Sequence, residues 1–271
     1  MNYWESGDYT RALDQANRAL GLDDDFVPAL RVRAMVLMRG RTMTGLDEAI
    51  QIWEDLDDGT ENRWTIQHAV AHQRRADVLR RAQRLELADD DTEEAIALYE
   101  GVLDADPDDV YALEGFVQVL AASGDWDRCL EAADRYVRHI ELSRQGWTRK
   151  LTLRGIEAEE ERMIRSRIRT NRSKEARWRG LRANILHKTG QPMEAERELR
   201  TVLELDPGLV AEYLNRARVR AELGLWLLAN QDAHTFVARS DQAADNPLTR
   251  EAFAIIREAE SHGVSPAGIA Q

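Results

Sequence analysis

The sequence has few of the residues that define several classes of protein. Its single cysteine, Cys129, excludes an internal disulfide framework. The 271 residues include only 16 glycines and 6 prolines, and runs of Val, Ile and Thr are rare, so a strand-rich fold is not expected. No apolar run approaches the roughly 18 residues that a membrane-spanning helix needs. The sequence has no Gly-rich phosphate loop and no nucleophile motif, so we expect neither a cofactor nor catalysis.

Lysine is also scarce, since only Lys150, Lys174 and Lys188 occur among the 37 basic residues and the rest are arginine. Acidic residues outnumber basic ones, and the formal net charge is −12. A charge of this size and sign disfavours non-specific contact with nucleic acid or anionic membranes. We therefore expect another protein or a peptide as partner rather than nucleic acid.

Ala, Leu, Glu and Arg at helical spacing fill almost every segment, which predicts an all-α protein. One pattern recurs along the chain, and four copies of it open with glycine. These copies are GDYTRALDQANRAL (7–20), GDWDRCLEAADRYV (124–137), GQPMEAERELRTVL (190–203) and GLWLLANQDAHTFV (224–237). A small residue follows the glycine by five positions, and further small or apolar residues follow four and seven positions later. This spacing places the side chains on one face of a helix that begins after a turn.

Two further copies of the pattern, at 46–56 and 92–103, lack the glycine. The small residues of the six copies are Ala12, Ala49, Ala95, Cys129, Ala195 and Ala229, separated by 37, 46, 34, 66 and 34 residues. A unit of about 34 residues fits two intervals directly and a third when doubled. We therefore predict a degenerate unit at about 143–175, turn insertions in the first two intervals, and a long helix from about 63 to 87.

The period, together with the Asp-Pro in LDADPDD (103–109) and LELDPGL (203–209), resembles the tetratricopeptide repeat, a helix–turn–helix unit. The preceding helices lack the family's Trp–Leu–Gly, and an unrelated helical array is the alternative. The resemblance implies a right-handed α-solenoid of about seven units over residues 1–243, a capping helix at 244–263 and a tail at 264–271. In the capping helix we expect Asn246 as the N-cap residue and Pro247 at the first helical position. Its apolar stripe comprises Ala252, Phe253, Ile256 and Ala259.

The stretch NYWESGDYTRAL (2–13) reads as the second half of a unit, with Tyr3 and Gly7 where the family pattern places them. The first helix of that unit would begin before Met1. We hypothesise that the chain is a fragment of a longer protein or begins at a late start codon. The lack of a recognisable signal peptide is then uninformative about the compartment, for which the cytoplasm is favoured.

Stacked repeats build a concave surface lined by the first helix of each unit, and the resemblance implies that peptides bind there. Asn184 and Asn215, 31 residues apart, are expected on such helices, where each amide could pair with a peptide backbone. With Arg218 they form the predicted peptide-binding groove. Their spacing resembles the family's carboxylate clamp, but Gly180 and Asp245 occupy positions where the clamp has basic residues. Ordinary exposed polar residues are the alternative interpretation.

The segment RMIRSRIRTNRSKEARWRGLR (162–182) is strongly basic and contains one acid, Glu175. Four of its arginines share one helix face: Arg162, Arg165, Arg169 and Arg172. They form a candidate anion site for an acidic protein, RNA or a phosphorylated segment. The alternative is a solvated face on which the preceding EAEEE (157–161) pairs with them at i, i+4. Trp178 could stack on a base but is expected in the seam between helices.

Other polar clusters have structural interpretations. His68 and His72 lie one helical turn apart, but no third ligand is evident, so no metal site is expected. We expect turns at the acidic runs 23–25, 89–91 and 106–109. Asp91 and Glu94 resemble a capping box at a helix start. Cys129 takes the small-residue position of its unit and is expected to be buried and inert.

These observations predict a non-catalytic scaffold that binds a peptide or helix of another protein in its concave groove. Two alternatives are open. The first unit, which lacks a cap, could stack on a second copy of the chain or on an upstream domain. The Arg-rich segment could instead make the protein an RNA- or anion-binding module.

Overall fold

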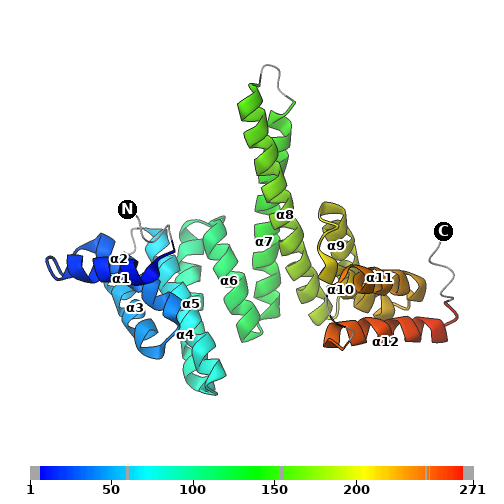
Figure 1. The fold of residues 1–271 in the computed structure, drawn as a ribbon, viewed down its shortest axis with the longest axis horizontal. Coiled ribbons are helices and arrows are strands. Elements are labelled where there is room, and N and C mark those ends of the chain that lie inside the picture. Colours follow the sequence, from blue (N-terminus) through cyan, green and yellow to red (C-terminus); the bar gives the residue numbers. More distant parts are fainter. Residues whose placement is uncertain (1–6, 59–60, 153–155, 242, 244, 265–271) are drawn as a thin grey trace. The chain divides into compact units, whose positions relative to one another are not determined.

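The computed structural model describes residues 7–58, 61–152, 156–241, 243 and 245–264. These residues form twelve helices joined by turns and contain no strand, which confirms the predicted all-α fold (Figure 1). The helices are α1 (Tyr9–Leu20), α2 (Val27–Gly40), α3 (Met43–Leu56), α4 (Asn62–Arg81), α5 (Leu85–Ala105), α6 (Val110–Ser123), α7 (Trp126–Lys150), α8 (Ala158–Lys188), α9 (Pro192–Leu205), α10 (Val210–Glu222), α11 (Trp226–Arg239) and α12 (Pro247–Ser261). None of these described helices has both the length and the apolar character needed to span a membrane.

The chain divides into two compact modules, Met1–Ala132 and Ala133–Gln271, and the division falls within α7. We call them the N-terminal and the C-terminal module. In the N-terminal module α2 pairs with α3 and α4 with α5, and each pair packs on its neighbours in the chain. In the C-terminal module α8 pairs with α9 and α10 with α11, while α12 packs against both α10 and α11. Each module is therefore an array of helix pairs.

The recurrent pattern lies on α1 and on the second helix of each pair, and its small residues are all buried. They are Ala12, Ala49, Ala95, Cys129, Ala195 and Ala229. The glycines that open four copies have φ between 72° and 82°: Gly7, Gly124, Gly190 and Gly224. At the turns that precede the two copies without glycine, Arg41 (φ 51°) and Gln83 (φ 60°) take the same left-handed conformation. A left-handed residue lets the chain reverse direction between two helices, which explains why glycine recurs there.

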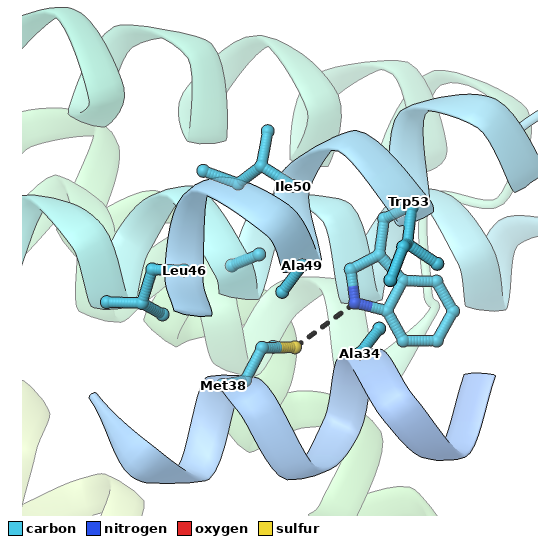
Figure 2. Close-up of a cluster of buried hydrophobic side chains, with 8 residues drawn as sticks. Ala34, Met38, Leu46, Ala49, Ile50 and Trp53 are labelled. Carbon is cyan, nitrogen blue, oxygen red and sulfur yellow. Dashed lines mark hydrogen bonds between the residues drawn. The ribbon is translucent and has the colours of Figure 1, made fainter. Parts of the chain in front are cut away.

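The pair α2 and α3 shows how small and large residues share the seam (Figure 2). Ala34 of α2 and Ala49 of α3 let the two helices approach, and Trp53 fills the space beside them. The indole Nε1 of Trp53 donates a hydrogen bond to the sulfur of Met38 at 3.1 Å. The one polar atom of this buried ring is thereby satisfied.

Several helices are longer than predicted, and this corrects the expected organisation. The interval of 46 residues between Ala49 and Ala95 is longer than one unit. Its extra residues lie in α4 and α5, which have 20 and 21 residues, rather than in a turn. The predicted long helix from 63 to 87 is wrong, because α4 ends at Arg81 and the chain turns at Gln83. That turn contains neither glycine nor proline, so the amino-acid sequence did not indicate a helix end there.

The interval of 66 residues has a similar explanation. Residues 143–175 form the end of α7 and the first part of α8, which have 25 and 31 residues, instead of a separate degenerate unit. A fifth pair is formed by α6 and α7, where the thiol of Cys129 donates to the carbonyl oxygen of Val117 at 3.4 Å. The described residues therefore contain five helix pairs, with α1 before them and α12 after them, rather than about seven units.

The end of the array agrees with its predicted signals. The side chain of Asn246 accepts a hydrogen bond from the backbone N–H of Leu248 at 2.9 Å, and Pro247 is the first residue of α12. In the apolar stripe Ile255 is buried in place of Phe253, which is 38% exposed. Tyr3, which carried part of the motif at the start of the chain, lies outside the described residues.

Candidate functional site

The predicted groove residues lie on the first helices of two consecutive pairs, Asn184 on α8 and Asn215 with Arg218 on α10. Asn184 is exposed. Asn215 donates to Glu212 at 2.9 Å and accepts from Arg218 at 2.7 Å, and Arg218 also contacts Glu251 of α12 at 2.7 Å. The amide of Asn215 and the guanidinium of Arg218 thus already have partners within the chain. A peptide that used them would have to replace these contacts.

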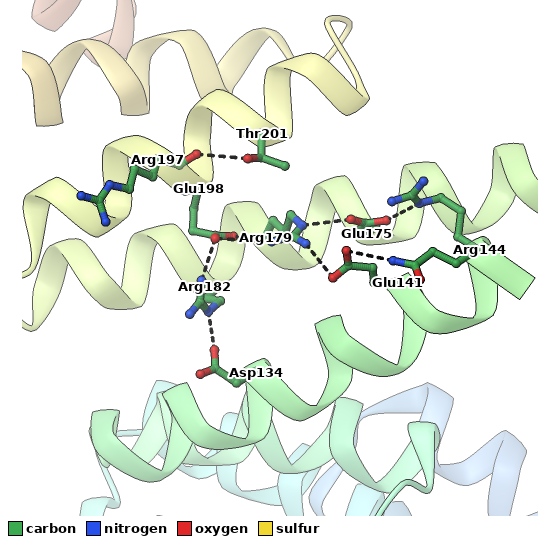
Figure 3. A network of polar contacts seen from close by, with 10 residues as sticks. Asp134, Glu141, Arg144, Glu175, Arg179, Arg182, Arg197, Glu198 and Thr201 are labelled. Atoms are coloured by element: carbon green, nitrogen blue, oxygen red, sulfur yellow. Dashed lines mark hydrogen bonds and ion pairs between the residues drawn. The ribbon is translucent and has the colours of Figure 1, made fainter.

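The C-terminal half of the basic segment 162–182 belongs to an ion-pair network (Figure 3). Arg179 contacts Glu141, Glu175 and Glu198. Arg182 contacts Glu198 at 2.7 Å and also Asp134. The ring of Trp178 lies against that of Tyr136 with centroids 4.0 Å apart, so this tryptophan is in the seam.

The four arginines of the candidate anion site lie on α8 and have different environments. Arg165 pairs with Glu161 at 2.6 Å, the i, i+4 contact that the structural alternative predicted. Arg172 donates to the carbonyl oxygens of Glu204 and Leu205 at the end of α9, at 2.7 and 2.6 Å. The remaining two, Arg162 and Arg169, have exposed side chains. Only part of the predicted basic face is therefore available to an anion. That this face binds an anion stays a prediction.

The histidine pair is buried between α4 and α5. Nε2 of His68 and Nε2 of His72 are 3.3 Å apart, and Nδ1 of His72 lies 2.8 Å from Asp91. Arg75 donates to the same carboxylate at 2.7 Å. The expectation that the run 89–91 forms a turn, with Asp91 and Glu94 as a capping box, is wrong because Asp91 lies inside α5 and is buried.

The environment of this cluster shifts the pKa values of His68 and Asp91. Burial lowers the pKa of His68, and the neighbouring His72 lowers it further. Burial alone would raise the pKa of Asp91, but hydrogen bonds from Arg75 and His72 outweigh this effect, so the pKa is lowered. Among the described residues no group of three or more histidine, cysteine or acidic side chains is arranged to hold a metal ion. We read the cluster as a structural polar network.

The N-terminal module contains a pocket of about 370 Å³ between α4 and α6, the first helices of consecutive pairs. Its lining includes Arg41, Gln73, Arg74, Tyr111, Glu114 and Gln118. The fully buried Tyr99 of α5 forms part of the wall and donates a long hydrogen bond to Gln73 at 3.5 Å. Burial raises the pKa of this tyrosine, so its hydroxyl stays protonated.

Gly115 of α6 explains how the pocket is built. A Cβ atom at this position would lie 2.6 Å from Cε1 of Tyr99 and closer still to Cζ and the hydroxyl oxygen. The absence of a side chain thus lets α6 pass directly over the tyrosine ring. The pocket was not predicted from the sequence, although an isolated glycine inside a helical pattern can have a packing reason.

Residues 86–143 match the family model of the tetratricopeptide repeat. Over this stretch the chain is similar to the tetratricopeptide repeat family. Its fold is similar to the assembly chaperone of RpL4, with a TM-score of 0.58 and 13% identity over 90% of this chain and 89% of that one. A tetratricopeptide repeat protein from Parabacteroides merdae gives a TM-score of 0.53 and 16% identity over 99% and 92%. No curated protein sequence matches.

The C-terminal part of a repeat-containing protein from Cytophaga hutchinsonii is also similar, with a TM-score of 0.55 and 12% identity over 98% of this chain and 95% of that one. At these identities the likeness concerns the fold. A helical repeat fold of this kind is typical of scaffolds for protein–protein interaction.

Proposed function

We propose that this protein is a non-catalytic scaffold that binds an extended peptide segment of a partner protein across the pocket between α4 and α6. The observation that carries the proposal is the position of the pocket. It lies between the first helices of two consecutive pairs, the surface that stacked repeats present to a partner.

The side chains around the pocket suit a peptide backbone. Gln67 and Gln73 of α4 and Gln118 of α6 line it, and each amide offers both a donor and an acceptor. Gln73 donates a weak hydrogen bond to Gln118 at 3.4 Å, which joins α4 and α6 at an exposed position. A peptide backbone could replace this contact with stronger ones. Because the helices already hold these amides in place, little ordering accompanies binding.

Selection from a random heptapeptide display library with the purified chain tests this proposal. We expect enriched peptides whose affinity falls about tenfold when Gln73 and Gln118 are both changed to Ala. The matched comparison changes Asn184, Asn215 and Arg218 to Ala, which disables the other groove. Loss of binding only in this second variant would move the site to the C-terminal module. If no peptide is enriched, the proposal is wrong.

Self-association is the second candidate, and one observation favours it. Three large apolar side chains are exposed around the turn between α1 and α2: Leu22 at 92%, Phe26 at 43% and Val27 at 43%. Exposed apolar side chains gathered in one place often mark an interaction site. Light scattering over a hundredfold range of concentration should then show a rising mass, which Leu22→Ser with Phe26→Ser abolishes. A constant mass would reject this candidate.

A further inference from the structure

The pocket contains an arginine that lacks a partner. The guanidinium of Arg74 has neither an ion pair nor a hydrogen bond to any residue that the structure describes. Comparable part-buried arginines contact carboxylates: Arg75 contacts Asp91 at 2.7 Å, and Arg216 contacts Asp232 at 2.7 Å. A charged group that is partly withdrawn from water without a partner is unfavourable. In a chain with more acidic than basic residues, its missing partner is best sought in a ligand.

Two further arginines lie near Arg74. Burial lowers its pKa, and the nearby Arg41 and Arg39 lower it further. Arg41 also lines the pocket and has φ 51°, a conformation that favours glycine. At four of the other turns of this kind the chain has glycine. A non-glycine residue at a strained turn position is consistent with a role for its side chain, and here that side chain lines the pocket.

The remaining charges of the pocket limit the ligand. Asp77 and Glu114 also line it, so its two arginines face two carboxylates. Asp77 only partly offsets the effect of Arg39 and Arg41 on Arg74. A group with one negative charge suits this arrangement, because a group with two would be repelled by the carboxylates of the lining.

We propose that this pocket binds the carboxylate of an Asp or Glu side chain within an extended peptide. The carboxylate lies on Arg74 and Arg41, and the adjacent peptide backbone lies on Gln73 and Gln118. Charge-assisted hydrogen bonds from guanidinium groups to a carboxylate are among the stronger polar contacts in proteins. This inference rests on the peptide-binding function proposed above and adds the chemistry of one ligand residue.

The heptapeptide display library provides the test, with the acidic preference of the enriched peptides as the readout. Selections with the unchanged chain should enrich Asp or Glu at one position. With Arg74→Gln, which keeps a polar side chain but removes its positive charge, this preference should disappear. Arg81→Gln is the matched control, because Arg81 is an exposed arginine of the same helix outside the pocket, and it should leave the preference unchanged.

A second pair of variants separates binding from folding. Arg41→Gly relieves the strained turn, so it should raise the melting temperature and yet weaken a selected acidic peptide by about tenfold. Gln83→Gly relieves the corresponding strain at the next turn, outside the pocket, and should raise the melting temperature without changing the affinity. If Arg41→Gly binds the peptide as tightly as the unchanged chain, Arg41 has no part in the site and the proposal is overturned.

Synthetic forms of a selected peptide, measured by fluorescence anisotropy, complete the test without any change to the protein. Replacing the preferred acidic residue by its amide should weaken binding by about tenfold to a hundredfold. A phosphoserine form that binds tenfold more tightly would show a phosphate site and overturn the carboxylate assignment. Enriched peptides without an acidic preference would refute this inference and leave the proposed function standing. A library with no enriched peptide would refute both.

Discussion

Replacing Gly115 by alanine tests whether the close approach of α6 to Tyr99 constrains the N-terminal module. The added methyl group would lie 2.6 Å from Cε1 of the ring, whereas carbon atoms in contact stay about 3.5 Å apart. The ring is fully buried, and it borders the pocket between α4 and α6. Overpacking of this kind costs about 1–3 kcal/mol, and the severity of the overlap favours the upper end.

An opposing effect must be subtracted from this figure. Alanine stabilises a helix interior by about 1 kcal/mol relative to glycine, because it restricts the unfolded chain. We therefore expect Gly115→Ala to lower the free energy of unfolding by about 2 kcal/mol, as measured by urea denaturation. In a Tyr99→Leu background the same change should stabilise the protein by about 1 kcal/mol. A Gly115→Ala variant more stable than the unchanged chain would show that the ring yields freely, and the reasoning would fail.

Three further predictions concern other features. Gln83→Gly should raise the free energy of unfolding in urea by about 1 kcal/mol, whereas Gln83→Ala, which keeps a Cβ atom, should not. Because burial lowers the pKa of His68, the unfolded chain binds its proton more tightly, and stability should fall as the pH drops below about 6.5. His68→Gln should flatten this dependence between pH 7 and 5, and an unchanged slope would contradict the assignment. Glu196 is buried and contacts Arg220 at 2.8 Å, so Glu196→Gln should cost about 3 kcal/mol in urea unfolding, and a loss below about 1 kcal/mol would argue against a desolvated pair.

The features of the fold that follow from local chemistry could be predicted from the sequence. Small residues such as Ala95 and Ala229 recur because two helices must cross closely, and this requirement repeats in every pair. Glycines such as Gly124 recur because the turn needs a positive φ. The turn at Gln83 was not predicted, because glutamine rarely takes the left-handed conformation and its presence does not indicate a turn. The lengths of α7 and α8 were not predicted because neither helix contains a proline, and the glycines within them, Gly146 and Gly180, do not end the helix.

The candidate site was harder to predict, because it depends on residues far apart in the chain. Asn184 and Asn215 were placed correctly on first helices by their spacing, but spacing does not reveal the contacts of Asn215 with Glu212 and Arg218. The pocket in the N-terminal module arises where Arg41, Arg74 and Gly115 meet through packing. Nothing in the local sequence indicates that Arg74 lacks a partner, because an acid, Asp77, follows it three residues later.

The positions of the lysines have a practical consequence for work on this protein. Lys150 ends α7, and Lys174 and Lys188 lie on α8, all three with exposed side chains. Reagents that couple to side-chain amines will therefore label only the C-terminal module, and a biotin or fluorophore attached in this way leaves the pocket between α4 and α6 chemically unaltered. Enzymes that acetylate or ubiquitinate lysine side chains could modify only these same two helices. Such modifications would therefore lie outside the surface proposed to bind peptides.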